Sequence, residues 1–155
     1  MNALQGVLTA KAAFAEPANV TKDIPFGFAA VRPHGLPHSL YEELWHLDFW
    51  LQFSLALVRG EQPALPAHSS GSWPVDNDVL DEVSWRELLE RVQEGLAAAS
   101  VLAGDEQGLG RAFRPDRTVG GELTVVAAHN AYHLGRMVTL RQLLGIWPPE
   151  LGDSW

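Results

Sequence analysis

The 155-residue sequence contains no cysteine. Disulfides, cysteine nucleophiles, iron–sulfur clusters and zinc sites of the Cys type are therefore excluded, and any metal site must use His and carboxylate ligands. Basic residues are also few, with eleven Lys and Arg against nineteen Asp and Glu and a formal charge of −8. Because no cluster of basic residues is available to contact phosphates, we expect no nucleic-acid partner.

Long apolar runs are missing too. The longest uncharged stretch with a helical pattern, residues 123–135, is shorter than the ~18–20 residues that a membrane span needs. Residues 1–16 lack the basic start and the unbroken apolar stretch of a secretory signal. The sequence therefore predicts a soluble, cytoplasmic protein with no membrane partner.

The composition predicts a single globular domain. Hydrophobic residues make up 46% of the chain and charged residues 19%, which is typical of a folded protein. A chain of this length buries roughly 70% of the surface that its unfolded form exposes. Because the sequence has no repeat and no shift in composition, we expect residues 1–155 to form one domain.

The hydrophobic pattern is helical throughout the chain. A first, weak helix is predicted over about residues 2–15, and the proline-containing residues 17–38 are expected to form an irregular connection. Ser39 and Glu42 form a capping box, which predicts the start of a second helix over residues 40–59.

Residues 60–83 contain several Gly and Pro residues and predict a long loop. A 20-residue helix is about 30 Å long, so a loop of this length can run back beside it and begin the third helix parallel to the second. A capping box at Ser84 and Glu87 is expected to start that third helix, which ends near Gly104.

The last helix is predicted over about residues 119–144, with Thr118 as its cap and a polar loop before it. The sequence thus predicts an all-α protein, a four-helix bundle with one long crossover loop.

The strongest chemical signal lies on the last helix, where residues 128–135 read AHNAYHLG. His129 and His133 are four residues apart, so both imidazoles project from one face and can bind one divalent ion. Asn130 stands where His-Glu-x-x-His metalloproteases carry their general-base Glu, which excludes that class. Two His residues alone are equally compatible with a hydrogen-bonded structural pair.

A third imidazole is available from the second helix. His46 has apolar and aromatic neighbours in the sequence, and a buried ring nitrogen without a partner costs ~1–3 kcal/mol. One metal ion shared by His46, His129 and His133 would satisfy all three rings. Three imidazoles also leave an open position for water or substrate, so we predict a divalent metal site.

Other polar residues are weaker candidates. His34 and His38 flank a Gly-Leu-Pro turn and are expected to pack in the loop or face solvent, and His68 is expected at the surface. Glu122 is expected to be a solvated residue of the first helical turn, with a supporting role behind the metal ligands as the alternative. Arg136 is expected either to meet an anionic substrate at the edge of a pocket or to form a surface ion pair.

These features resemble the DinB-like superfamily of metal-binding proteins. The resemblance covers about residues 32–145 and is carried by RPHGLPHS at 32–39, a Trp-Pro pair in the long loop, and AHNAYHLG on the last helix with Arg141 after it. Arg136 replaces the Gln that the family usually has. The resemblance implies an up-down-down-up bundle and one zinc or nickel ion held by His46, His129 and His133.

The same resemblance implies a class of chemistry. Characterised DinB-like proteins include S-transferases and isomerases that use low-molecular-weight thiols such as bacillithiol or mycothiol. Our leading interpretation is a metal-dependent thiol S-transferase-type enzyme with a small-molecule substrate, in which the metal binds the thiol as thiolate. A metal-dependent hydrolase and a non-catalytic, stress-related metal-binding protein are the alternatives.

The second helix has apolar residues on nearly every side, more than one bundle core can cover. We therefore expect a homodimer that buries helix faces near its two-fold axis, as is common among DinB-like proteins. Trp45 and Trp50 are expected in the core. Trp50 lies one turn after His46 and is, with Arg136, a candidate pocket residue.

Overall fold

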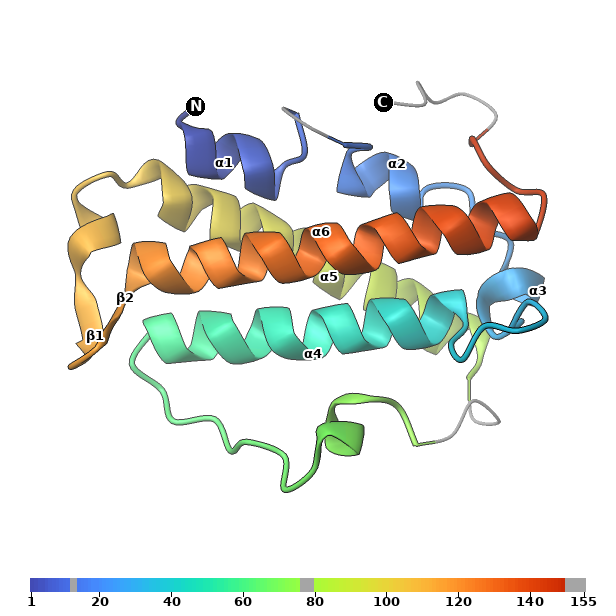
Figure 1. Ribbon diagram of the computed structural model, residues 1–155, viewed down its shortest axis with the longest axis horizontal. Coiled ribbons are helices and arrows are strands. Elements are labelled where there is room, and N and C mark those ends of the chain that lie inside the picture. The colour runs from blue at the N-terminus through green and yellow to red at the C-terminus, as the bar shows by residue number, and fades with distance from the viewer. Residues whose placement is uncertain (12–13, 76–79, 150–155) are drawn as a thin grey trace.

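The computed structural model describes residues 1–11, 14–75 and 80–149, and most of them form helices (Figure 1). Three long helices, α4 (Leu40–Val58), α5 (Glu82–Gly104) and α6 (Val119–Leu143), pack side by side. α4 and α5 begin at the same end of the molecule, whereas α6 runs in the opposite direction (Figure 1). The segment 59–75, with the short 3-10 helix η1 (Ser69–Ser72), runs back beside α4.

The start of α4 is the predicted capping box. The Ser39 hydroxyl accepts a hydrogen bond from the Glu42 amide at 3.2 Å, and Glu42 Oε2 accepts one from the Ser39 amide at 2.7 Å. After the last turn, Gly60 has a φ of +87°, a conformation that glycine adopts at low cost and that commonly ends a helix. These limits place His46 in the second turn of α4.

The predicted capping box at Ser84 and Glu87 is wrong. Asp81 occupies the cap instead, because its carboxylate accepts a hydrogen bond from the Ser84 amide at 2.7 Å and interacts favourably with the positive end of the helix dipole. α5 therefore begins earlier than expected, at Glu82, whereas its predicted end at Gly104 is confirmed.

α6 begins as predicted. The Thr118 hydroxyl accepts a hydrogen bond from the Gly121 amide at 3.2 Å and caps the helix. The polar loop expected before it contains a 3-10 helix, η2 (Gly108–Gly110), and a two-stranded antiparallel sheet, β1 (Ala112–Arg114) with β2 (Arg117–Thr118). These strands are too short to show the alternation of apolar and polar residues that predicts a strand.

The prediction of one helix over residues 2–15 is wrong. α1 spans only Ala3–Leu8, and two short helices, α2 (Pro17–Thr21) and α3 (Phe26–Ala29), lie in the segment that was expected to be irregular. Pro17 is the first residue of α2, and Pro25 immediately precedes α3. Proline is favourable at a helix start, where its missing N–H would have no partner in the helix. Residues 12–13 lie outside the described residues.

The short helices α1 and α2 pack across α5 and α6 (Figure 1). Arg141 of α6 is fully buried and connects α6 to α2 by donating a hydrogen bond to the main-chain oxygen of Val20 at 2.8 Å. It also donates to the main-chain oxygen of Ile146, just after α6, at 2.9 Å. The core between the long helices is apolar and includes Leu44, Leu47, Leu51, Leu88, Val92, Leu123 and Leu134. Within the described ranges, no helix combines the length and apolar character needed to cross a bilayer.

Candidate metal centre

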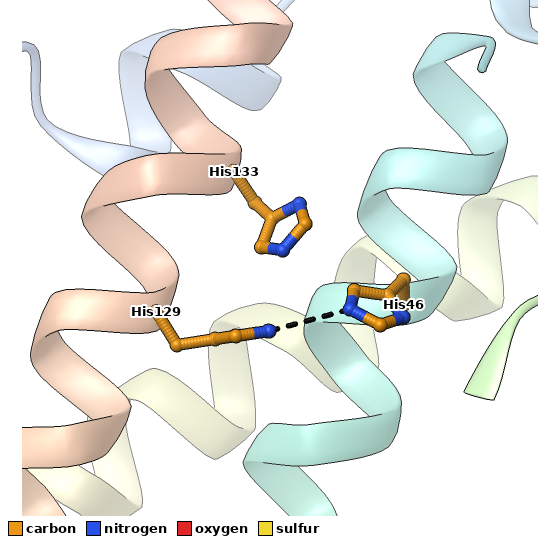
Figure 2. A group of neighbouring side chains, drawn as sticks. All are labelled: His46, His129 and His133. Atoms are coloured by element: carbon orange, nitrogen blue, oxygen red, sulfur yellow. Dashed lines mark hydrogen bonds between the residues drawn. The ribbon is translucent and has the colours of Figure 1, made fainter. Parts of the chain in front are cut away.

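The three predicted His ligands meet between α4 and α6 (Figure 2). His46 projects from α4, and His129 and His133 project from successive turns of α6 toward it. One ring nitrogen from each residue lies within 4.8 Å of the other two. The i, i+4 spacing on α6 and the side-by-side packing of the two helices together produce this cluster.

One of these contacts matches the geometry of a metal site. His129 Nε2 lies 3.3 Å from His46 Nε2. Two imidazole nitrogens that bind one tetrahedral zinc ion at about 2.0–2.1 Å lie about 3.3–3.4 Å from each other. The rings of His129 and His133 are also close, with centroids 4.4 Å apart. The donor set and this spacing fit a divalent metal ion.

The ring of His46 is held from the opposite side by the loop before α5. Its Nδ1 lies 2.7 Å from the Ser72 main-chain oxygen. Because a carbonyl only accepts hydrogen bonds, Nδ1 carries the proton and Nε2 presents its lone pair to the cluster. The indole of Trp73 stacks on the ring at a centroid distance of 3.9 Å, and His38 stacks on the other face of the indole at 3.8 Å.

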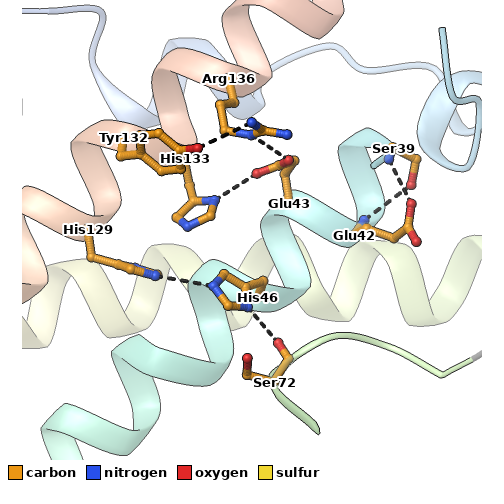
Figure 3. Close-up of polar contacts among 9 residues, drawn as sticks. All are labelled: Ser39, Glu42, Glu43, His46, Ser72, His129, Tyr132, His133 and Arg136. Carbon is orange, nitrogen blue, oxygen red and sulfur yellow. Dashed lines mark hydrogen bonds and ion pairs between the residues drawn. The ribbon is translucent and has the colours of Figure 1, made fainter. Parts of the chain in front are cut away.

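The ring of His133 is held by a carboxylate (Figure 3). Its Nδ1 donates to Oε2 of the fully buried Glu43 at 2.7 Å, and Arg136 Nε donates to the other carboxylate oxygen at 2.7 Å. This leaves the Nε2 lone pair of His133 available to the cluster as well. A carboxylate behind a ligating imidazole fixes the ring and raises its basicity.

The electrostatic environment favours neutral imidazoles. Burial lowers the pKa of His46, and burial, reinforced by the neighbouring His133 and His46, lowers the pKa of His129 to about 4. Although burial acts to raise the pKa of Glu43, hydrogen bonds from His133 and Arg136 bring it below its ordinary value. At pH 7, His46 and His129 therefore offer unprotonated ring nitrogens near the negative charge of Glu43, an arrangement that favours a cation.

A cavity of about 460 Å³ opens beside His129. Trp50 lines it together with Asn130 and Glu122. Of the three His residues of the cluster, His129 lines this cavity.

The prediction that Glu122 is solvated is wrong. Its side chain is buried and accepts hydrogen bonds from the Ser54 hydroxyl at 2.7 Å and from Arg117 at 3.1 Å. These two donors, one from α4 and one from β2, compensate for the removal of the carboxylate from water.

The remaining candidates lie in several different environments. Arg136 is paired with Glu43 and is not among the described residues that line the cavity beside His129. His34 and His68 are exposed, and His38 is half-buried against Trp73. Trp45 is half-buried and packs against the core.

Sequence reasoning missed three contributors to the site: Glu43, Trp73 and the buried side chain of Asn130. Glu43 lies three residues before His46 on α4, and this spacing places both on one face. That signal could have identified it. Trp73 comes from a loop, whose path no periodicity predicts.

A family model for the DinB superfamily matches residues 13–137. No curated protein and no solved structure gave a significant match to the chain. The family match covers most of the sequence and includes all three His residues of the cluster. The chain therefore belongs to the DinB superfamily.

Proposed function

We propose that His46, His129 and His133 bind one divalent metal ion, zinc or nickel, and that the protein is a metal-dependent thiol S-transferase-type enzyme with a small-molecule substrate. The observation that carries the proposal is the convergence of three ring nitrogens while the opposite nitrogens of two rings donate to oxygen atoms. Such outer hydrogen bonds are typical of ligating imidazoles.

The metal, when bound, would lower the pKa of a low-molecular-weight thiol such as bacillithiol or mycothiol and so supply a thiolate nucleophile at neutral pH. The chain itself has no cysteine, so the thiol comes from a cofactor. Glu43 and the Ser72 carbonyl hold the ligand rings in place, and the cavity beside His129 binds the substrate.

The hydrogen bonding of nearby carboxylates favours this chemistry over metal-dependent hydrolysis. A hydrolase of this kind commonly uses a carboxylate as general base. Glu43 already accepts from His133 and Arg136, and Glu122 already accepts from a hydroxyl and a guanidinium. Both carboxylates are therefore committed to positioning other side chains.

Cobalt substitution tests this function directly. We expect bacillithiol, mycothiol or glutathione, added to the cobalt-loaded protein near neutral pH, to produce a saturable thiolate-to-cobalt charge-transfer band. The His68→Ala variant should retain the band, and the His133→Ala variant should lose it. No spectral change at millimolar thiol would contradict the transferase proposal and favour a hydrolytic or non-catalytic, stress-related metal-binding protein.

We further propose an overall arrangement for the protein. Residues 1–155 form one domain, an up-down-down-up four-helix bundle in which α1 and α2 together take the place of the first helix. We also propose that the protein works in the cytoplasm, where thiol cofactors are kept reduced.

The proposed assembly is a homodimer. Trp45, Phe49, Trp50 and Phe53 form a row of half-buried aromatic rings along α4, with neighbouring centroids 5.2–5.6 Å apart. A continuous aromatic face of this kind is typical of an association surface.

A further inference from the structure

The cavity beside His129 is lined by α4, by α6 and by the β1–β2 hairpin, which lies next to the end of α4 and the start of α6 (Figure 1). Apolar side chains from both helices form much of its wall, among them Trp50, Phe53, Val125 and Val126. Its volume of about 460 Å³ is large enough for a small organic molecule. An aromatic or aliphatic ligand body fits walls of this kind.

The hairpin brings two arginines to this cavity. Arg114 and Arg117 flank its two-residue turn and are paired with each other in the register of β1 and β2. Residues directly opposite in an antiparallel pair project from the same face, with Cβ atoms about 4.5–5.5 Å apart, and both arginines line the cavity. Because like charges in this relation repel each other, an anion beside both guanidinium groups would be favourable.

One of the two guanidinium groups already has an anionic partner. Arg117 donates to Glu122 at 3.1 Å, and this buried carboxylate also accepts from the Ser54 hydroxyl. Arg114, by contrast, forms no ion pair within the part of the chain that the structure describes. Asp116, an exposed residue of the turn, lines the cavity as well but forms an ion pair with neither arginine. Arg114 is therefore available to pair with a ligand.

The hairpin is rich in positive charge and is connected to α4. Residues 111–117 contain three of the eleven Lys and Arg residues in a chain with a formal charge of −8. Arg111 donates to the main-chain oxygen of Val58, the last residue of α4, at 2.7 Å. This hydrogen bond joins the hairpin to one of the two helices that line the cavity.

The position of Glu122 sets the length of a ligand that reaches from the arginines to the cluster. Glu122 contacts Arg117 and precedes His129 by seven residues on α6. At 1.5 Å per residue, these two positions lie about 10 Å apart along the helix. A molecule with an acidic group at one end and an apolar body of about this length can contact both.

We propose that this cavity binds an elongated, largely apolar small molecule with one carboxylate, which pairs with Arg114 beside Arg117. A single negative charge matches the single unpaired guanidinium, whereas a phosphate of about −1.5 to −2 charge would be repelled by Asp116 and Glu122. The inference rests on the proposed function in one respect: the ligand is a substrate of the metal centre because His129 lines the same cavity. Arg114 is then the residue that selects the substrate by its acidic group.

Three probes with the same apolar body test the proposal: 4-phenylbutyrate, 4-phenylbutanamide and 4-phenylbutylamine. Their affinities for the metal-free and the zinc-loaded protein are measured by NMR titration. In both forms we expect the carboxylate to bind about fivefold more tightly than the amide, the amine to bind no better than the amide, and added salt to weaken the preference. The carboxylate should also shift the Nε–H signal of Arg114. Because the metal-free protein suffices, failure of this test is distinct from failure of the metal site or of thiol binding.

The variant Arg114→Gln removes the unpaired guanidinium, and we expect it to bind the carboxylate and the amide equally. The matched control is Arg86→Gln, which removes the same charge from an exposed position on α5 and should keep the wild-type preference. Asp116→Asn removes a negative charge from the cavity and should bind the carboxylate at least as tightly as wild type.

Several results would overturn the proposal. These are no binding of any probe at millimolar concentration, equal binding of all three, or a preference for the amine. A carboxylate preference that persists in Arg114→Gln, that is lost equally in Arg86→Gln, or that appears only in the zinc-loaded protein also overturns it, since the anion is then held elsewhere. Should Arg114→Gln not fold, the wild-type ranking and the Arg114 signal decide.

Discussion

Glu43 on α4 accepts the Nδ1 proton of His133 on α6 at 2.7 Å. The carboxylate thus orients one proposed ligand on the neighbouring helix, and His46, three residues later on its own helix, is another proposed ligand. The same interaction brings the negative charge of Glu43 behind the cluster, in which burial lowers the pKa of His46 and His129. A cation placed among the rings would be stabilised by this arrangement.

Replacing this carboxylate should weaken metal binding without removing a ligand. We expect Glu43→Gln to reduce metal affinity by about 10–100-fold, since the neutral amide is a weaker acceptor for His133. Competition with a chromophoric chelator measures the change. Glu61→Gln, which alters an exposed carboxylate paired with Arg59, is the control and should bind like wild type. Equal affinity of all three proteins would contradict this role of Glu43.

The indole of Trp73 should contribute to stability through its two stacked neighbours. Trp73→Ala removes the stacks on His38 and His46, and we expect a loss of about 1–3 kcal/mol in the free energy of unfolding. His38→Ala removes only one stack and should lose less. Urea denaturation of the metal-free proteins tests this ordering. A larger loss in His38→Ala than in Trp73→Ala would show that the stack is not what stabilises this loop.

The low pKa of His129 predicts how stability depends on pH. In the metal-free protein this ring has a pKa of about 4, below the value of about 6.5 in an unfolded chain. Between these values the unfolded state binds more protons, so the free energy of unfolding falls as the pH is lowered from about 6.5 toward 4. We expect His129→Gln to show a shallower fall than wild type or His68→Gln. Identical slopes in denaturation at pH 7 and pH 5 would be inconsistent with the shift.

The aromatic row on α4 makes the assembly testable. We expect light scattering at low micromolar concentration to give twice the chain mass of 17.0 kDa. Phe49→Asp places a charge within the row and should yield monomers, whereas Val101→Asp alters an exposed position on α5 and should not. A monomer mass for the wild-type protein would argue against the dimer.

The parts of the fold that the sequence predicted are those set by local rules. The Ser39–Glu42 box, the glycine after α4 and the Thr118 cap each involve residues within one turn, so their pattern is visible in the sequence. The short helices α2 and α3 were missed because proline can both interrupt and start a helix. Which of these happens at Pro17 depends on the packing of α2 against α5 and α6.

In the candidate site, too, the residues set by local spacing could be predicted and their distant partners could not. The i, i+4 pair on α6 could be predicted, and a third His on a buried helix completed the set. The partners that fix these rings lie far away in the sequence: Ser72 is 26 residues from His46, and Glu43 is 90 residues from His133. Tertiary structure alone brings them together. Glu122 was misjudged for this reason, because its donors belong to α4 and β2.

Metal analysis of the purified protein tests the central claim most directly. Elemental analysis after loading with zinc or nickel and removal of excess metal should give about one ion per chain. Each of His46→Ala, His129→Ala and His133→Ala should retain much less metal, whereas His34→Ala and His68→Ala should match wild type. A wild-type protein that retains no metal, or five variants that retain it equally, would contradict a metal site at these three residues.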